Sequence, residues 1–415
     1  MSKNIVVLSD GTWNDGAESE TNIHWLNEYL VEEPGRQVVF YDKGVGADWF
    51  NERTGGALGV GLSRNVRQLY AKVLDAYEPG DDIYCFGFSR GAFTVRSLCG
   101  FMNLVGRVGS ESEIDEAYTY YRIHEPNEAD NVLERFFKPT TKGPIAIRFL
   151  GVFDTVGSLG LPFEIDDDAT ALRGSFLQNA RNAFLGWLDG LGDRLRRPIK
   201  GFHDTNLGGN VEEAYHALAI DERRRLFPPT MWTGAPGTAL KLGSNGDSQR
   251  VAQRIEQTWF AGVHSDVGGG YVDMPRPIRI SNLPLLWMAE KAEAAGLVFK
   301  PGFLDELWDW AGVLATAPQH DSLTQTWNRL HRITGNPELI RPIGNRARQR
   351  DNPEHDQFPL VDTLEWIDGS VARRLERNVE IRHGDEPDQP RRAIYNPPNV
   401  VRSMIQEATE DPMVA

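Results

Sequence analysis

A serine between two glycines carries the strongest chemical signal in the sequence. Residues 87–91 read Gly-Phe-Ser-Arg-Gly, a G-x-S-x-G pattern with Ser89 at its centre. A short apolar run, residues 83–86, precedes it, and a stretch with helical periodicity, residues 92–105, follows it. In that context the pattern predicts a nucleophile elbow, a sharp strand-to-helix turn that lifts the serine oxygen above the sheet edge. Glycines are expected at both positions because a Cβ there would clash with the neighbouring strand or helix.

A serine nucleophile needs a base within hydrogen-bonding reach, and His264 is the leading candidate. It follows a predicted strand over residues 255–263. The carboxyl ends of parallel strands meet at one edge of a sheet, which is also the edge predicted for Ser89. The glycines at 268–270 would allow a loop that reaches back to the serine.

Two other histidines are assigned lesser roles. His216 falls in a helix predicted near residues 211–220, where it is interpreted as structural. His203 lies in the Gly-Phe-His-Asp run of residues 201–204 and is a secondary candidate near the site.

Two aspartates compete to orient the histidine. Asp154 ends a predicted strand over residues 145–153, and Asp266 lies two residues after His264. A residue at that short spacing rarely folds back on the same imidazole, whereas one at a neighbouring strand end can. Asp154 is therefore the preferred acid, and Asp266 remains the alternative. The resulting chain order, Ser-Asp-His, is the order found in α/β-hydrolases.

Backbone amides are the expected donors to the oxyanion that forms during acyl transfer. One usually belongs to the residue after the nucleophile, and the other to a loop after an earlier strand. These positions correspond to Arg90 and to the turn that holds Gly11 and Thr12.

A metal-dependent hydrolase is the rival enzyme. Four potential ligands stand at predicted strand ends: Asp10, Asp154, His264 and Asp266. Three carboxylates and a histidine could hold a divalent cation for hydrolysis. A non-catalytic binding module of hydrolase fold is the rival from another class. The serine mechanism is preferred, and it predicts no metal and no cofactor.

The elements that would position these residues alternate along the first half of the chain. Strands are predicted at 5–9, 37–41, 82–86, 145–153 and 255–263, and helices at 22–33, 62–77 and 90–105. Such alternation is typical of a parallel α/β sheet. The sequence predicts an α/β-hydrolase fold: a mostly parallel sheet flanked by helices, with a lid-like helical insertion and a helical C-terminal portion.

The predicted organisation is one hydrolase domain spanning 1–415. A helical insertion covers 158–254, between the acid and base strands, and a helical and loop portion covers 282–415. The tail after Glu376 is rich in proline and is predicted to be mostly loop.

The insertion contains an amphipathic stretch at 172–195. Residues 171–200 hold six basic and two acidic side chains in a chain of net charge −15. An apolar face with a basic flank is typical of a helix that lies on a lipid surface, which would make this stretch a lid and a membrane contact. Packing on the core is the alternative, and its glycines weaken any long helix.

Composition excludes several other classes. The strongly acidic balance makes nucleic acid an unsuitable partner. Two cysteines, Cys85 and Cys99, are too few for a disulfide scaffold and are expected to be small buried residues. Neither a signal peptide nor a transmembrane run is predicted, which favours a protein that is cytoplasmic as synthesised and is compatible with signal-independent secretion.

Five blocks, in order along the chain, carry a family resemblance. They are residues 8–14 (LSDGTWN), 87–92 (GFSRGA), 151–157 (GVFDTVG), 214–223 (AYHALAIDER) and 259–271 (WFAGVHSDVGGGY), with a weaker echo at 395–400 (YNPPNV). Together they resemble the α/β-hydrolase domain family that includes the catalytic domain of type VI secretion phospholipase effectors.

The resemblance implies a serine hydrolase of ester bonds, with Ser89 as nucleophile, Asp154 as acid and His264 as base. For the effectors it implies phospholipase activity and delivery into rival cells. An ester or lipid substrate is therefore expected, and an inhibitory or immunity protein is the expected partner of an exported member.

Overall fold

The computed structural model describes most of the chain. The described residues are 2–11, 20–44, 57–109, 111–123, 140–156, 207–224, 227–233, 235–243, 247–314, 316–323, 340–341, 343, 365–383 and 386–400. The amphipathic stretch 172–195, His203 and Thr12 lie outside them.

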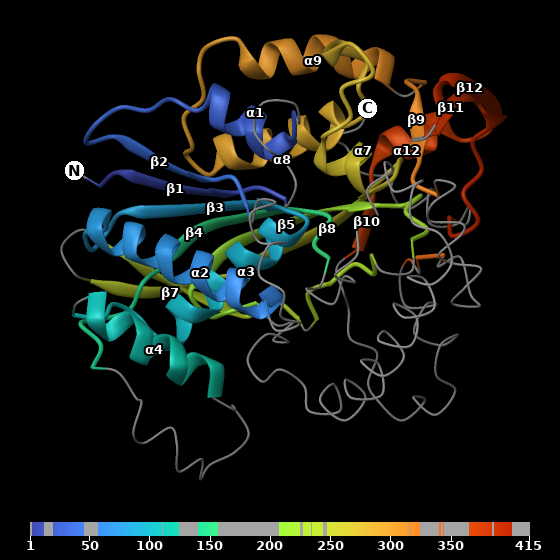
Figure 1. The fold of residues 1–415 in the computed structure, drawn as a ribbon. Helices are drawn as coiled ribbons and strands as arrows, with labels where there is room; N and C mark the ends of the chain where they lie inside the picture. Colours follow the sequence, from blue (N-terminus) through green and yellow to red (C-terminus); the bar gives the residue numbers. More distant parts are fainter. Residues whose placement is uncertain are drawn as a thin grey trace, which may run out of the picture.

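A parallel sheet forms the centre of the fold (Figure 1). Among the described residues it has seven strands in the order β10-β8-β5-β4-β3-β1-β2, and every neighbouring pair is parallel. The strands are β1 (Asn4–Ser9), β2 (Gln37–Asp42), β3 (Asp82–Phe88), β4 (Ile147–Phe153), β5 (Val211–Ala219), β8 (Arg254–Phe260) and β10 (Glu365–Ile367). The predicted mostly parallel α/β sheet is confirmed.

Helices cover both faces of this sheet (Figure 1). On one face lie α2 (Ala57–Ala76), α3 (Arg90–Val105) and α4 (Glu111–Ile123). On the other lie α1 (Asn22–Tyr29), α8 (Asn282–Ala294) and α9 (Phe303–Leu314). Parallel strands need such crossover helices, and the helices then bury both faces of the sheet.

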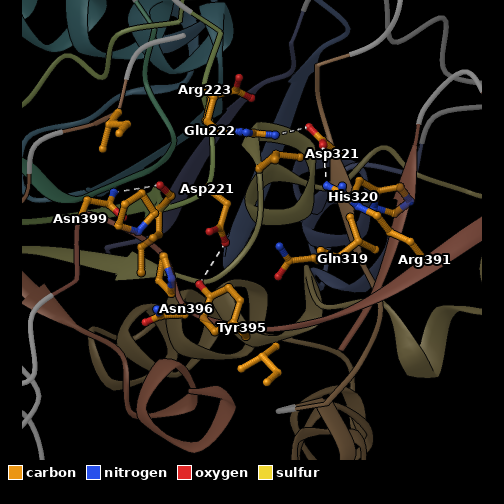
Figure 2. Close-up of a pocket in the computed structure, with 17 residues that line it drawn as sticks. Asp221, Glu222, Arg223, Gln319, His320, Asp321, Arg391, Tyr395, Asn396 and Asn399 are labelled. Carbon is orange, nitrogen blue, oxygen red and sulfur yellow. Dashed lines mark hydrogen bonds and ion pairs between the residues drawn. The ribbon is translucent and has the colours of Figure 1, made fainter. Parts of the chain in front are cut away.

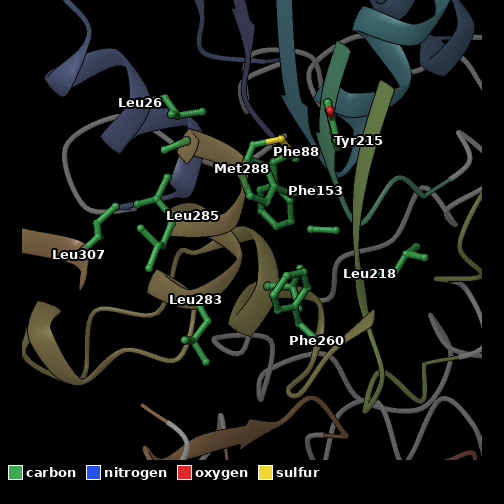
Figure 3. Packing of buried hydrophobic residues seen from close by; sticks show 14 of the residues in the cluster. Leu26, Phe88, Phe153, Tyr215, Leu218, Phe260, Leu283, Leu285, Met288 and Leu307 are labelled. Atoms are coloured by element: carbon green, nitrogen blue, oxygen red, sulfur yellow. The ribbon is translucent and has the colours of Figure 1, made fainter. Parts of the chain in front are cut away.

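Two hydrophobic cores follow from this layering. Along β3, Ile83 and Cys85 belong to the core under α2 and α3, while Phe86 and Phe88 belong to the core under α8. The alternation is the period of two that a strand imposes on its side chains. Both cysteines are buried as expected. Figure 3 shows Phe88, Phe153 and Met288 in the second core, so the residues before Ser89 and Asp154 are anchored by packing.

The segment predicted as a helix near residue 216 is a strand, and that prediction was wrong. Residues Val211–Ala219 form β5, which lies between β4 and β8 in the sheet. Glutamate, alanine and leucine favour a helix locally, but burial on both faces of the sheet overrides that preference. Part of the predicted helical insertion 158–254 is therefore a central strand, and part is the hairpin of β6 (Thr238–Leu242) and β7 (Ser248–Ala252).

The C-terminal portion contains strands as well as helices. A small sheet joins β9 (Gln319–Asp321), β11 (Asn378–His383) and β12 (Glu386–Ile394), with β11 and β12 antiparallel. The prediction of a mostly loop tail after Glu376 was wrong, because this hairpin pairs with a distant strand. The short helix α12 (Gly369–Arg374) precedes it. Within the described residues, no helix combines the length and apolar character needed to cross a membrane.

Candidate active site

The strand-to-helix turn at Ser89 has the strained geometry of a nucleophile elbow. Ser89 has φ 56° and ψ −121°, in a region that side-chain-bearing residues rarely adopt. It sits between β3 and the first residue of α3, and its N–H donates to the Phe153 carbonyl oxygen at 3.1 Å. This hydrogen bond ties the turn to the end of β4.

The two glycines of the motif make the turn possible. A Cβ on Gly87 would lie 2.6 Å from the backbone of Ala92 in α3. A Cβ on Gly91 would lie 2.1 Å from the carbonyl oxygen of Ser9 at the end of β1. Both positions therefore require glycine for close backbone approach, as the sequence predicted.

His264 reaches the elbow from the other half of the sheet. It begins the short helix α7 (His264–Gly268), where the sequence had predicted only a loop. This helix packs closely on the strand before the serine, because a Cβ on Gly268 would lie 1.9 Å from the ring of Phe88. The backbone N–H of His264 donates to Glu222 Oε2 at 3.2 Å.

Ser89, His264 and Asp154 form one hydrogen-bonded chain. The Oγ of Ser89 lies 2.8 Å from Nε2 of His264, and Nδ1 of His264 lies 2.6 Å from Oδ2 of Asp154. Ser89 directly follows β3, Asp154 directly follows β4, and His264 begins α7, the element after β8. Ser89 is 8% exposed, His264 5% and Asp154 0%, so the chain is nearly closed to solvent.

An arginine that sequence reasoning missed completes the surroundings of Asp154. Arg341 donates from Nη1 to Oδ1 at 2.6 Å and from Nη2 to Oδ2 at 3.0 Å, and both side chains are fully buried. No motif marks this residue, and it is 187 positions from Asp154 in the chain. Its only sequence signal is a lone charge between Ile340 and the Pro342-Ile343 pair.

The electrostatics of the site are dominated by burial and two arginines. Burial is the largest single influence on Asp154 and would raise its pKa, but the charges and hydrogen bonds of Arg341 and His264 together hold the pKa well below its usual value. For His264, burial lowers the pKa below its usual value, against the opposing effect of Asp154. A neutral imidazole is the form that can accept a proton from Ser89.

A second carboxylate–arginine pair contacts the backbone of the histidine. Glu222 accepts from Nε and Nη2 of Arg224, each at 2.9 Å. Burial is the largest single influence on Glu222 and would raise its pKa, but the charge and hydrogen bonds of Arg224, with the charges of Arg341 and His264, together lower the pKa to about 2. The rings of Phe227 and His264 form a T-shaped pair with 5.1 Å between their centroids, and the centroid of Phe88 lies 4.7 Å from that of His264. The imidazole is therefore held between apolar rings.

Asp266, the alternative acid, is directed to another histidine. Its Oδ1 lies 2.6 Å from Nδ1 of His320, and Nε2 of His320 lies 3.1 Å from Oδ1 of Asp273. Burial would lower the pKa of His320, but the charge of Asp266, and then that of Asp273, raises it. Asp154, and not Asp266, bonds to His264.

Two of the four residues of the metal hypothesis, Asp154 and His264, contact each other, whereas Asp10 and Asp266 bond to other side chains. Asp10 accepts from the hydroxyls of Thr21 and Tyr41, at 2.7 and 2.9 Å. Asp154 and Asp266 face two different histidines, as described above. Across the described residues, no group of three or more His, Cys, Asp or Glu side chains is arranged to hold a metal ion. That hypothesis has no ligand cluster here.

The three residues expected to donate to the oxyanion have different environments or fall outside the described residues. Arg90 is the first residue of α3, where backbone N–H groups point out of the helix end. The N–H of Gly11 donates to the Oδ1 of Asp10 at 2.7 Å, so it is engaged within its own turn. Thr12 falls outside the described residues.

His216 supports the turn that carries the acid. It lies in β5, fully buried, and its Nε2 accepts the backbone N–H of Thr155 at 3.0 Å. Burial, and then the charge of Arg96, lowers its pKa to about 3. A neutral imidazole in this position stabilises the backbone immediately after Asp154.

The described residues also form a separate cavity of about 240 Å³. Glu222 and Val263 line it, whereas Ser89, Asp154 and His264 do not. Figure 2 shows further lining residues from β9, from β12 and from the segment after β12, where the hydroxyl of Tyr395 donates to Asp221. The C-terminal portion thus closes around the strand ends next to the site.

The sheet, the strained serine turn and the hydrogen-bonded histidine and aspartate together define the α/β-hydrolase class. Residues 3–291 match the model of the type VI secretion phospholipase effector Tle1-like catalytic domain, and the chain belongs to that family. The resemblance drawn from the sequence is confirmed. The family is described as a phospholipase catalytic domain, which supports esterase or lipase chemistry.

Individual proteins that resemble this chain include one curated sequence and two solved structures. The uncharacterized protein YEL023C of Saccharomyces cerevisiae is 28% identical over 400 residues, covering 73% of this chain and 59% of its own. An uncharacterized protein from Pseudomonas aeruginosa is structurally similar with a TM-score of 0.39 and 18% identity, covering 74% of this chain and 47% of that one.

A further solved structure is the Tle1 effector bound to the VgrG spike of the type VI secretion system. It has a TM-score of 0.30 and 17% identity, and the match covers 65% of this chain and 51% of that one. This chain therefore spans only about half to three fifths of the length of these relatives.

Proposed function

We propose that this protein is a serine hydrolase of carboxylic esters that acts on lipids. The observation that carries the proposal is the unbroken hydrogen-bond chain from Ser89 through His264 to Asp154, with the serine at a strained turn. Residues held in such sparsely populated backbone regions cluster at active sites, which supports a functional role for this turn.

In the proposed mechanism Ser89 attacks the acyl carbonyl while Nε2 of His264 takes the proton from Oγ. The same imidazole then protonates the leaving alcohol, and an acyl group remains on the serine. Water attacks this acyl-enzyme with His264 again as base, which releases the acid and restores the serine. Asp154 holds the Nδ1–H tautomer and stabilises the imidazolium in both steps.

The oxyanion would be stabilised by the amino end of α3, where Arg90 supplies the first amide. A second amide from the turn after β1 completes the proposed hole. In the structure Gly11 donates to Asp10, so its use as that donor requires this hydrogen bond to open when substrate binds.

A lipid substrate is proposed from the family and from the chemistry around the imidazole. The family is described as a phospholipase catalytic domain. Phe88 and Phe227 pack on His264, so the reacting centre has apolar walls suited to an acyl chain. Residues 172–195 are proposed as the membrane contact, on sequence pattern alone.

Roles beyond the hydrolase reaction follow the same family description. An effector role, and with it an inhibitory or immunity protein as partner, is proposed for this chain by analogy with the phospholipase effectors. We also propose that residues 1–415 act as one hydrolase unit. Arg341, which belongs to the C-terminal portion 282–415, bonds to Asp154 and so links that portion to the proposed site.

The proposal is tested with a fluorophosphonate probe and two substrates, a soluble short-chain ester and a long-chain phospholipid in vesicles. Wild-type protein should be labelled and should hydrolyse both. Ser89→Ala should abolish labelling and reduce turnover about 10⁴–10⁶-fold, while the fold persists.

Ser248→Ala is the matched control, because that serine is exposed on β7. It should behave as wild type. Near-normal turnover by folded Ser89→Ala protein contradicts the proposal. Loss of activity with EDTA that added metal restores would favour the metal-dependent alternative, whereas hydrolysis of the soluble ester alone would remove the lipid part.

A further inference from the structure

We propose that Arg341 is a positioning residue of the active site, which orients Asp154 toward His264 and balances the charge of the carboxylate. The inference rests on the proposed function, because it assigns a task within that same site. It adds a residue from outside the 3–291 segment that matches the family model.

The orientation argument starts from the hydrogen bonds of the carboxylate. Oδ1 of Asp154 accepts from the backbone N–H of Ala219 at 3.0 Å and from Nη1 of Arg341 at 2.6 Å. Oδ2 accepts from Nη2 of Arg341 at 3.0 Å and from Nδ1 of His264 at 2.6 Å. The planar guanidinium fork fixes the plane of the carboxylate, so one oxygen faces the imidazole.

Arg341 also holds two backbone segments that frame the site. Nη1 donates to the carbonyl oxygen of Ala219 at 2.9 Å, and Nη2 donates to that of Phe227 at 2.7 Å. The first is the end of β5, and the second carries the ring that packs on His264. One side chain thus connects the acid with the aromatic wall of the base.

The backbone of Arg341 is itself linked by hydrogen bonds to the segment that follows β5. The side-chain amide of Asn399 donates to the carbonyl oxygens of Ile220 and Arg341, at 3.1 and 3.0 Å. Asn399 belongs to the run that weakly echoed the family pattern at 395–400. The C-terminal portion therefore contributes to the site through two linked side chains.

The charge argument concerns the base. Among the described residues, Asp154, Glu222 and Arg224 are charged groups that act on His264, and Arg341 lies on the far side of the Asp154 carboxylate, bonded to both of its oxygens. With Asp154 balanced by Arg341, the carboxylate stabilises the imidazolium less than an unpaired carboxylate would. Removal of the Arg341 charge should therefore make His264 more basic and shift the acid limb of the rate profile to higher pH.

A purely structural ion pair would behave differently. Deletion of one partner of a buried pair leaves an unpaired charge, which typically costs about 3–5 kcal/mol of stability. That loss alone lowers the folded fraction but does not move the titration of the base. Measuring both the free energy of unfolding and the pH dependence of the rate therefore distinguishes a positioning role of Arg341 from a purely structural one.

The test compares Arg341→Met and Arg341→Lys with Arg374→Met in the full-length protein. Arg374 is also a buried arginine of the C-terminal portion, and it donates to Gln319 and to the carbonyl oxygen of Ala317. Its replacement matches the loss of a buried guanidinium without touching Asp154. Activity on a soluble ester is measured against pH and normalised to the folded fraction from circular dichroism.

For Arg341→Met we expect a raised acid midpoint and a fall in kcat of roughly a hundredfold, the scale of a misplaced catalytic group. Arg341→Lys keeps the charge but loses the fork, so kcat should fall while the midpoint stays near wild type. Arg374→Met should lower stability only. If Arg341→Met does not fold, Arg341→Lys alone decides the orientation role.

Wild-type kcat in folded Arg341→Lys, an unmoved midpoint in folded Arg341→Met, or an equal shift in Arg374→Met would each overturn the inference. An independent readout is the titration of the His264 imidazole by nuclear magnetic resonance, which needs no turnover. If the wild type proves inactive, the proposed function fails, yet a midpoint for His264 that rises in Arg341→Met still supports the charge role.

Discussion

The Oγ of Ser89 lies 2.8 Å from Nε2 of His264, although 175 residues separate them in the chain. Two glycines make this approach possible: Gly87 lets the elbow turn, and Gly268 lets α7 pack on Phe88. The contact therefore depends on close backbone packing at both ends, and it links the two halves of the parallel sheet at their carboxyl edge.

Asp154→Asn should reduce the turnover of a soluble ester by about 10⁴, because an amide favours the wrong imidazole tautomer. The variant should also lose stability, since the charge of Arg341 is left without its counterion. Asp266→Asn is the matched control and should cost far less activity, because Asp266 bonds to His320. Equal losses per folded molecule in the two variants would contradict the assignment of the acid.

The acid limb of kcat/KM should follow a single group with a midpoint below 6.5, the ordinary value for histidine. Burial lowers the pKa of His264, and the protonated imidazole below that midpoint cannot accept the serine proton. Asp154 titrates far lower because of Arg341, so it should not contribute to this limb. Initial rates on a soluble ester between about pH 4 and pH 8 give the midpoint. A value above 6.5 would refute this reading of the site.

His320→Gln should destabilise the protein most at mildly acidic pH. Asp266 and Asp273 raise the pKa of His320, so its contribution to folding is fully present below 6.5 and is lost as pH rises through the folded-state value. We expect a loss of about 2 kcal/mol in the free energy of unfolding near pH 6, from charged hydrogen bonds. The difference from wild type should shrink near pH 9, which urea unfolding at both pH values measures. A difference that does not change with pH would show that His320 contributes by packing only.

Gly91→Ala should disrupt the elbow, because its Cβ would lie 2.1 Å from a backbone oxygen of Ser9. To relieve this clash, α3 and β1 must move apart. We expect the free energy of unfolding to fall by about 3 kcal/mol or more. Activity should be lost as well, because the serine turn is displaced. Gly312→Ala in α9 is the control, since nothing lies within 4 Å of its Cβ. That change should stabilise the helix by about 0.5–1 kcal/mol. Thermal unfolding of both variants checks the pair, and a stable, active Gly91→Ala protein would be the contrary result.

Local patterns in the sequence were sufficient to predict the parallel sheet, the elbow at Ser89 and the helix that follows it. Apolar runs that end in Ser, Asp or His are visible without any structure, and parallel strands bring their carboxyl ends to one edge. This geometric rule is why Ser89, Asp154 and His264 could be grouped from sequence. The glycines of the elbow were equally predictable, because a tight turn excludes a Cβ.

Only the tertiary structure determined which side chains contact the residues at the sheet edge. Local propensity suggested a helix around His216, but burial between two strands makes that segment β5. Asp266 was a plausible acid until the fold placed His320 beside it. Arg341 carries no local signal, since a buried ion pair between residues 187 positions apart is determined by how distant segments pack. Sequence by itself thus determined which residues stand at the sheet edge, and the long-range packing of the C-terminal portion decided how their charges are balanced.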